Sequence, residues 1–250
     1  MSPAILLLLA VAGVAAGFLN TLAGGGTLIA VPALLAAGLP ADVANATNRV
    51  GVLAQSLAGA RGFDKGGRLD RRAALWVVVP SVLGALLGAF FASWVPPDVL
   101  RPILIGTLIA ITVVLLVSPT TIAAPAGSVP IDPRKRPLAL VALFGAGIYG
   151  GFVQAGMGLV LLTLLGGLLR YDLVRGNALK SLAIAALTAV ALIVFIANGK
   201  VDWLPGLVLA LGTVVGALLA VRFALVRGQR AVMRVVLVAV IGSCALLLFK

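Results

Sequence analysis

The feature that most constrains this chain is a series of long apolar stretches that contain no charged side chain. These stretches cover residues 1–41, 73–97, 102–131 and 138–169, and shorter ones cover 181–199, 203–221 and 235–249. A transmembrane helix needs about 20 consecutive apolar residues to cross a bilayer. Only 10% of the residues are charged, whereas soluble domains carry about 25%. We therefore predict an all-α polytopic membrane protein, with one further and more polar span at residues 43–60.

The residue types that are present argue against several classes of function. His and Glu are absent and Cys244 is the only cysteine, so the usual metal sites, Ser–His triads and His or Glu proton relays have no residues to build them. We expect no enzyme activity, no catalytic residue, no metal and no cofactor. The net charge of +12 would suggest nucleic acid as a partner of a soluble chain, but the Lys and Arg residues collect between the apolar stretches. That distribution indicates orientation in a lipid bilayer, so no nucleic acid is expected.

The two halves of the chain resemble each other. Residues 17–20 match residues 151–154, residues 24–26 match 156–158, and Asn45-Ala46 matches Asn177-Ala178. Small residues at 11–16 could mark a signal-peptide cleavage site, but no basic segment precedes them and the region recurs within the chain. We predict an internal duplication, with a first transmembrane repeat at 1–118, a basic cytoplasmic linker at 119–137 and a second transmembrane repeat at 138–250.

The charges between the apolar stretches indicate how the repeats are oriented. The segments 61–72, 118–137 and 222–234 are rich in Lys and Arg, which places them in the cytoplasm. The turns 94–101 and 198–202 carry one cation and one anion each, which places them outside. Segment 61–72 and its aligned partner 198–202 then lie on opposite sides, which predicts inverted repeats. A parallel arrangement is the alternative, and it would place the four arginines of 222–234 outside.

Inverted repeats require an odd number of crossings in each half, so the first apolar stretch must enter and leave on one side. A single helix over residues 3–38 would extend about 54 Å, against a hydrocarbon core of about 30 Å. We expect a hairpin of two short or half-membrane helices broken at residues 22–27, and a matching break near 154–158. Each repeat would then be a broken-helix hairpin followed by three transmembrane helices, a pattern typical of secondary transporters.

The two breaks are where we expect a substrate to bind. A helix that stops and restarts inside the bilayer leaves backbone groups unpaired, which is tolerated only beside protein or a water-filled cavity. The N-terminal end of the restarting helix favours an anion. Close helix packing by small residues is the alternative reading of the glycines. The candidate substrate-binding residues at the breaks are Asn20, Thr21, Gly24, Gly25, Gly26, Thr27, Gln154, Gly156 and Gly158.

A second group of candidates lies in the spans that follow the breaks. Arg49 and Lys180 each place a cation a few turns into a span, where an ionisable residue is a candidate for function. Asn45, Asn48 and Asn177 accompany them as candidate substrate ligands. Carboxylates are scarce nearby, so we expect unpaired cations that face a cavity and favour an anionic substrate. The alternative is that both side chains extend to the membrane interface.

One segment of the first half resembles a known family. The segment Gly17–Leu35 with its three consecutive glycines, the following Gly38-Leu39 and the segment Asn45–Arg49 are similar to the TauE/SafE family of sulfite and organosulfonate exporters. The duplication and the basic central linker extend this resemblance over nearly the whole chain. The second half departs from the triple glycine with Gly156-Met157-Gly158. The resemblance implies a multi-pass protein of the bacterial inner membrane that exports small sulfur-containing anions such as sulfite or sulfoacetate.

The sequence also suggests how transport is energised. An anion that moves outward through an inside-negative potential releases about 2.3 kcal/mol per charge and per 100 mV. We therefore expect export by rocking of the two repeats without a coupling ion, with a small anion and the lipid bilayer as partners. An ion-coupled uptake permease for a sulfur anion such as thiosulfate is the first alternative. A membrane-embedded enzyme or a structural protein is the more remote one, and the formation of a homo-oligomer is left open.

Overall fold

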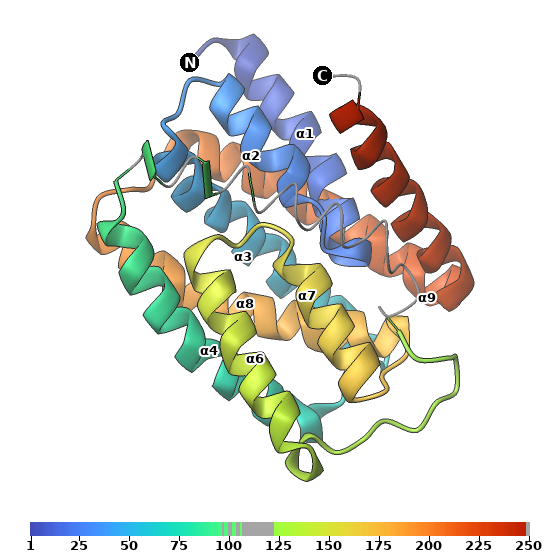
Figure 1. Cartoon of the computed structure of the whole chain (residues 1–250). Coiled ribbons are helices and arrows are strands. Elements are labelled where there is room, and N and C mark those ends of the chain that lie inside the picture. The colour runs from blue at the N-terminus through green and yellow to red at the C-terminus, as the bar shows by residue number, and fades with distance from the viewer. Residues whose placement is uncertain (97, 100–101, 104–105, 107–122, 249–250) are drawn as a thin grey trace.

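The computed structural model of the chain describes residues 1–96, 98–99, 102–103, 106 and 123–248, and the secondary structure of this part is helical (Figure 1). The elements are α1 (Pro3–Ala23), α2 (Thr27–Ala36), α3 (Ala41–Lys65), α4 (Arg71–Trp94), the 3₁₀ turn η2 (Pro133–Lys135), α6 (Pro137–Phe152), α7 (Met157–Thr163), the π-helical turn η3 (Leu164–Leu168), α8 (Leu173–Ala197) and α9 (Trp203–Leu248). Among the described residues, α1, α4, α8 and the part of α9 at Trp203–Val235 are long and apolar enough to cross a membrane. The predicted all-α membrane fold is confirmed.

The helix boundaries follow the predicted duplication closely. Helices α3 and α8 are equal in length, and they begin at Ala41 and Leu173, which are as far apart in the chain as Asn45 and Asn177. Helices α4 and α9 begin at Arg71 and Trp203, again with the same separation. The polar span predicted at 43–60 corresponds to α3.

The last two expected spans, 203–221 and 235–249, both fall in α9. A non-helical backbone at Gly228, with φ 69° and ψ −173°, divides this element into two helical parts, and the two expected spans lie on either side of it. The third span of the first repeat, expected within 102–131, lies largely outside the described residues.

Both predicted breaks are present. Helix α1 ends at Ala23, Gly24 caps it in the left-handed region with φ 80°, and α2 begins at Thr27. In the second half, α6 ends at Phe152 and α7 begins at Met157. Helix α1 is longer than a half-membrane helix, since its 21 residues are enough to cross a bilayer.

The first helix of each hairpin packs against the other half of the chain, α1 on α9 and α6 on α4. A Cβ atom at Gly17 would overlap the carbonyl of Thr213, and one at Gly147 would overlap the carbonyl of Ser81. Because Ser81 and Thr213 are equivalent positions in the duplication, Gly17 is equivalent to Gly147 and not to Gly151. The match of residues 17–20 with 151–154 is therefore wrong by roughly one helical turn.

The separation in sequence between equivalent residues of the two hairpins is thus two residues shorter than the separation between equivalent residues of the helices that follow them. The match of residues 24–26 with 156–158 is wrong for the same reason, since Thr27 and Met157 both begin the second helix of a hairpin. The π-helical turn η3 takes up part of this difference, because a π turn accommodates an extra residue.

The helices α3 and α8 cross at the centre of the molecule and run in opposite directions (Figure 1). The start of α3 lies beside the residues that follow α8, since Asp42 pairs with Lys200 at 2.6 Å. Further along α3, a Cβ atom at Gly59 would lie 3.2 Å from Oγ of Ser181, near the start of α8. Equivalent helices of the two predicted repeats are therefore antiparallel.

Candidate functional site

Arg49 extends from α3 to the C-terminal end of α6. Its Nη1 donates to the carbonyl of Gly150 at 3.1 Å and to Oε1 of Gln154 at 2.8 Å, and its Nη2 donates to the carbonyl of Gly151 at 2.7 Å. The side chain is 0% exposed. The last carbonyls of a helix have no intrahelical partner and carry the negative end of the helix dipole. Arg49 therefore satisfies the end of α6 where the second break begins.

Lys180 makes the corresponding contacts from α8 to the C-terminal end of α1. Its Nζ donates to the carbonyls of Asn20 and Thr21, both at 2.8 Å, and to Oδ1 of Asn177 at 2.6 Å. Nδ2 of Asn177 donates in turn to the carbonyl of Leu22 at 3.0 Å. An ammonium group has three N–H donors, and all three are used here. Lys180 is 1% exposed, so its charge lies inside the protein.

The two clusters are related by the duplication. Asn45 donates to the carbonyl of Phe152 at 3.3 Å, as Asn177 does to the carbonyl of Leu22. Each cation thus holds the first hairpin helix of the other predicted repeat. Arg49 and Lys180 thus have hydrogen-bond partners, but these are neutral oxygens, and no ion pair with a carboxylate is formed by either cation among the described residues. The alternative in which both side chains extend to the membrane interface is contradicted, because both are buried inside the protein.

The glycines at the breaks have different surroundings. A Cβ atom at Gly24 would overlap the backbone of Gly158, and one at Gly158 would overlap Gly24, so the two breaks touch at these positions. A Cβ atom at Gly26 would overlap the carbonyl of Ala16. Packing thus explains the absence of a side chain at these three glycines. Gly25 differs, because a Cβ atom there would meet only the Leu28 side chain, at 3.7 Å.

The remaining candidates at the breaks lie at helix ends. Thr27 is buried and begins α2, and the next two N–H groups of this helix, those of Leu28 and Ile29, donate to the carbonyls of Gly25 and Gly26, each at 3.0 Å. Gly156 precedes α7 with φ 67°. Gln154 adopts φ 66°, which is rare and costs of order 1 kcal/mol for a residue with a side chain. Its Oε1 accepts from Arg49 and, at 3.5 Å, from Oγ1 of Thr188. These contacts hold the second break in a conformation that Gly24 adopts in the first.

Five buried polar atoms on α3 have no hydrogen-bond partner among the described residues. They are Oδ1 of Asp42, Oδ1 of Asn45, Nδ2 of Asn48, Nε of Arg49 and Oε1 of Gln55. Buried polar groups in proteins are almost always paired, and an unpaired one costs about 1–3 kcal/mol. Asn48 and Arg49 are neighbours, and both of their unpaired atoms are N–H donors. This turn of α3 can therefore donate two further hydrogen bonds to a ligand or to water.

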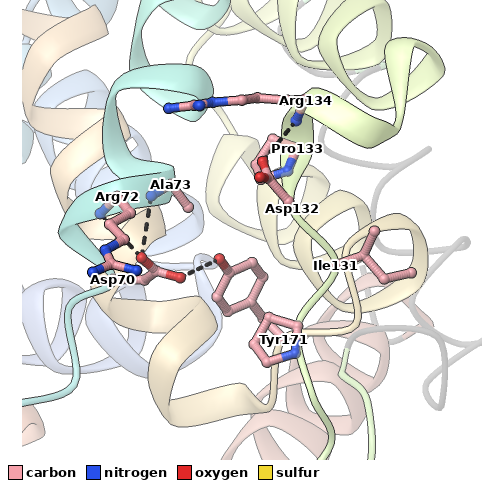
Figure 2. Close-up of a pocket in the computed structure, with 9 residues that line it drawn as sticks. Asp70, Arg72, Ala73, Ile131, Asp132, Pro133, Arg134 and Tyr171 are labelled. Carbon is pink, nitrogen blue, oxygen red and sulfur yellow. Dashed lines mark hydrogen bonds between the residues drawn. The ribbon is translucent and has the colours of Figure 1, made fainter.

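A cavity lies where the two halves of the chain meet, away from these clusters. It measures about 560 Å³ and is lined by Asp70, Arg72, Ala73, Pro130, Ile131, Asp132, Pro133, Arg134 and Tyr171 (Figure 2). The Tyr171 hydroxyl donates to Oδ2 of Asp70 at 2.8 Å. Burial and this hydrogen bond raise the pKa of Tyr171 far above its usual value, so the phenol stays protonated as a donor. None of the candidate residues from the sequence lines this cavity.

Several contacts of the clusters were not found from the sequence. The Arg49 guanidinium lies over the ring of Phe195, with 4.7 Å between its central carbon and the ring centroid. Phe195 aligns with Phe63 in the duplication, and that was the only signal for it. The carbonyl acceptors had no signal, because every residue carries the same backbone oxygen.

Comparison with known proteins places these features in a family. The model of the sulfite exporter TauE/SafE family matches residues 9–248. The chain is 30% identical to the probable membrane transporter protein YfcA of Escherichia coli K12, over 99% of this chain and 91% of that protein. It is 32% identical to the probable membrane transporter protein ORF9 of a Sinorhizobium species, over 90% of this chain and 85% of the relative. A probable membrane transporter protein of Haemophilus influenzae is 25% identical, over 87% and 84%. No solved structure matches the chain.

Proposed function

The chain belongs to the TauE/SafE sulfite exporter family, and we propose that it exports small sulfur-containing anions, bound between its two repeats at the helix breaks. The family and the names of the relatives indicate a multi-pass bacterial membrane transporter and not an enzyme. Sulfite, sulfoacetate and related organosulfonates are the substrates that we propose, and the inner membrane is the proposed location.

The observation that carries this proposal is the pairing of two buried cations with neutral groups alone. Every hydrogen-bond partner described for Arg49 and Lys180 is a carbonyl or amide oxygen. Such oxygens satisfy N–H donors, but they leave the net positive charge in place. A charge removed from water costs several kcal/mol unless a counter-charge accompanies it. A small anion between the repeats would supply that counter-charge.

The unpaired donors on α3 support a particular location for the anion. Nδ2 of Asn48 and Nε of Arg49 are buried and have no acceptor among the described residues. A sulfonate or sulfite group offers several oxygen acceptors, and a charged acceptor strengthens each hydrogen bond. We therefore place the anion beside this turn of α3, with the backbone N–H of Thr27 at the start of α2 as one further donor.

The proposed transport cycle is a rocking of two oppositely oriented repeats, 1–118 and 138–250, joined by the linker 119–137. The antiparallel crossing of α3 and α8 supports this orientation, because equivalent helices of inverted repeats run in opposite directions. Export of an anion then runs down the inside-negative membrane potential, which supplies about 2.3 kcal/mol per charge and per 100 mV.

The test is counterflow of labelled sulfite, sulfoacetate, thiosulfate and sulfate in proteoliposomes. The wild type is compared with Arg49→Ala and, as a matched control, with Arg61→Ala, which removes an exposed arginine further along the same helix. We expect counterflow of at least one sulfur anion in the wild type and in Arg61→Ala, and its loss in Arg49→Ala. Equal counterflow in all three proteins would remove Arg49 from the site. Accumulation that requires Na⁺ would favour the uptake permease instead.

A further inference from the structure

Two contacts between the halves of the chain lie at opposite ends of the molecule and involve equivalent turns. The turn at residues 66–70 connects α3 to α4, and its counterpart in the duplication, the turn at 198–202, connects α8 to α9. Each turn contacts the other repeat at or just before the start of its central helix. The two contacts are thus related by the duplication, although their residues differ.

The contact at the 198–202 turn joins the second repeat to the start of α3. Nζ of Lys200 lies 2.6 Å from Oδ2 of Asp42, and the backbone N–H of Asp202 donates to Oγ1 of Thr47 at 2.9 Å. The Asp42 side chain is 11% exposed and that of Lys200 is 34% exposed. The contact is partly buried, and the other carboxylate oxygen of Asp42, Oδ1, has no partner among the described residues.

The contact at the 66–70 turn joins the first repeat to the residues that precede α8. Oδ2 of Asp70 accepts from the Tyr171 hydroxyl at 2.8 Å, while Oδ1 of Asp70 accepts from the N–H groups of Arg72 and Ala73 and caps α4. Movement of the start of α4 away from the loop that precedes α8 would therefore stretch the bond to Tyr171. Figure 2 shows Tyr171 and Asp70 side by side on the wall of the 560 Å³ cavity.

We propose that these two contacts, Asp42–Lys200 and Asp70–Tyr171, are the two gates of the transporter, both closed here around the buried site. This inference rests on the proposed transport by rocking of the repeats. Opening one contact at a time would expose the breaks to one side of the membrane and then to the other. The charge pattern places Asp70–Tyr171 at the basic, cytoplasmic end and Asp42–Lys200 at the outer end.

The cavity beside Asp70 and Tyr171 then lies at the entrance of the inner gate. The linker residues 130–134 form one of its walls. Backbone hydrogen bonds tie this linker to the loop that carries Tyr171: the N–H of Ile131 donates to the carbonyl of Leu169 at 2.8 Å, and the N–H of Ala124 donates to the carbonyl of Tyr171 at 3.0 Å. Movement of the inner gate would therefore carry the linker with it.

The structure also offers a contact that should not act as a gate. Arg71 and Asp64 form an ion pair at 2.7 Å near the inner gate, but both residues belong to the first repeat. Rocking of one repeat against the other leaves this distance unchanged. Arg71→Ala is therefore the matched control for variants of the two gates.

The test measures access to the break from each side of the membrane, with a cysteine as the reporter. Gly25→Cys in a Cys244→Ala background places a thiol at the break, where a Cβ atom meets only the Leu28 side chain. Labelling by a membrane-impermeant thiol reagent is followed from either face of oriented vesicles. We expect Lys200→Ala to raise the labelling rate from the outer face at least threefold, and Tyr171→Phe to raise it from the cytoplasmic face by a similar factor. Arg71→Ala should change neither rate.

Labelling that is unchanged in both gate variants, or raised from the same face in both, would overturn the assignment of gates. A second measurement does not depend on these variants. A reducible bifunctional thiol reagent that joins the two cysteines of Asp42→Cys/Lys200→Cys, in the Cys244→Ala background, should abolish counterflow, and a reductant should restore it; full counterflow with the crosslink formed would also overturn the assignment. If the wild type carries no sulfur anion at all, the proposed function fails, while the labelling rates still report whether the contacts control access.

Discussion

The cluster around Arg49 and the cluster around Lys180 make equivalent hydrogen bonds, but they differ in how many of their buried polar atoms are left without a partner among the described residues. Both cations hold the C-terminal end of the opposite hairpin helix, and an asparagine one turn earlier assists each of them. Every donor of Lys180 has an acceptor, and Asn177 is paired through both of its side-chain atoms. The Arg49 side is different, because Arg49, Asn45 and Asn48 each leave a buried polar atom without a partner among the described residues.

This difference indicates a division of roles between the repeats. The Lys180 cluster is complete by itself and stabilises the end of α1. The Arg49 cluster holds the end of α6, and two of its N–H donors, on Asn48 and Arg49, still have no acceptor among the described residues. We therefore propose that the anion binds nearer to α3 than to α8, and the following predictions test that asymmetry from the largest expected effect to the smallest.

The largest effect is expected from removing Arg49. Arg49→Ala leaves the last carbonyls of α6 and the strained Gln154 without their partner. Loss of a buried charged donor costs about 3 kcal/mol, so a fall of at least tenfold in transport rate and a lower thermal midpoint are expected. Arg49→Lys keeps the charge without the fork of donors and should retain part of the stability. A thermal scan and counterflow on the same preparations measure both effects, and an Arg49→Ala protein with unchanged transport would contradict the asymmetry.

The second effect concerns the contact between the two breaks. Gly24→Ala would force a side chain into the left-handed region and against the backbone of Gly158. We expect a loss of about 1–3 kcal/mol in stability, seen as a lower unfolding temperature in detergent. Gly25→Ala is the matched control, because its methyl group meets only the Leu28 side chain. If both variants unfold at the same temperature, the breaks do not depend on the contact between Gly24 and Gly158.

The third effect separates a ligand from a structural residue. Asn48→Leu removes an unpaired buried donor, so the protein should become no less stable while its transport rate falls severalfold. Asn177→Leu removes a side chain that is paired at both ends, so it should lower stability by about 1–3 kcal/mol. Thermal midpoints and counterflow rates of the two variants decide this. Equal losses of stability would mean that the two asparagines have the same role.

The smallest effect is expected at the position where the two breaks differ in residue type. Gln154→Gly relieves the positive φ angle but removes one acceptor of Arg49. These two effects are each of order 1 kcal/mol and opposite in sign, so the unfolding temperature should change little. A change as large as that of Gly24→Ala would show that Gln154 does more than occupy the turn.

The sequence predicted the parts of this arrangement that depend on residue type and spacing. The missing charges marked the helices, the glycines marked the breaks at Gly24 and Gly156, and the embedded cations marked Arg49 and Lys180. The acceptors of these cations could not be predicted, because they are backbone carbonyls whose position depends on how α1 and α6 pack across the molecule. The shift of the hairpins relative to the rest of the duplication was hidden for a similar reason, since the π-helical turn at Leu164–Leu168 has no reliable sequence signal.

The two contacts that we propose as gates could not be predicted from the sequence either. Asp70 aligned with Asp202 in the duplication, but their bonds differ, because Asp70 accepts through its carboxylate and Asp202 donates through its backbone. Tyr171 and Lys200 lie in connections between helices; Lys200 aligns with another cation, Arg68, but that match does not reveal which residue accepts from either of them. Only the packing of each turn against the opposite repeat brings these residues together.

The most direct test of the central claim is equilibrium binding of radiolabelled sulfite to the purified protein. We expect saturable binding of one anion per chain in the wild type and binding at least tenfold weaker in an Asn48→Leu/Arg49→Lys double variant, which keeps both buried cations but removes the two unpaired donors. Binding of equal affinity in the two proteins would contradict the claim that α3 supplies the ligands of the anion.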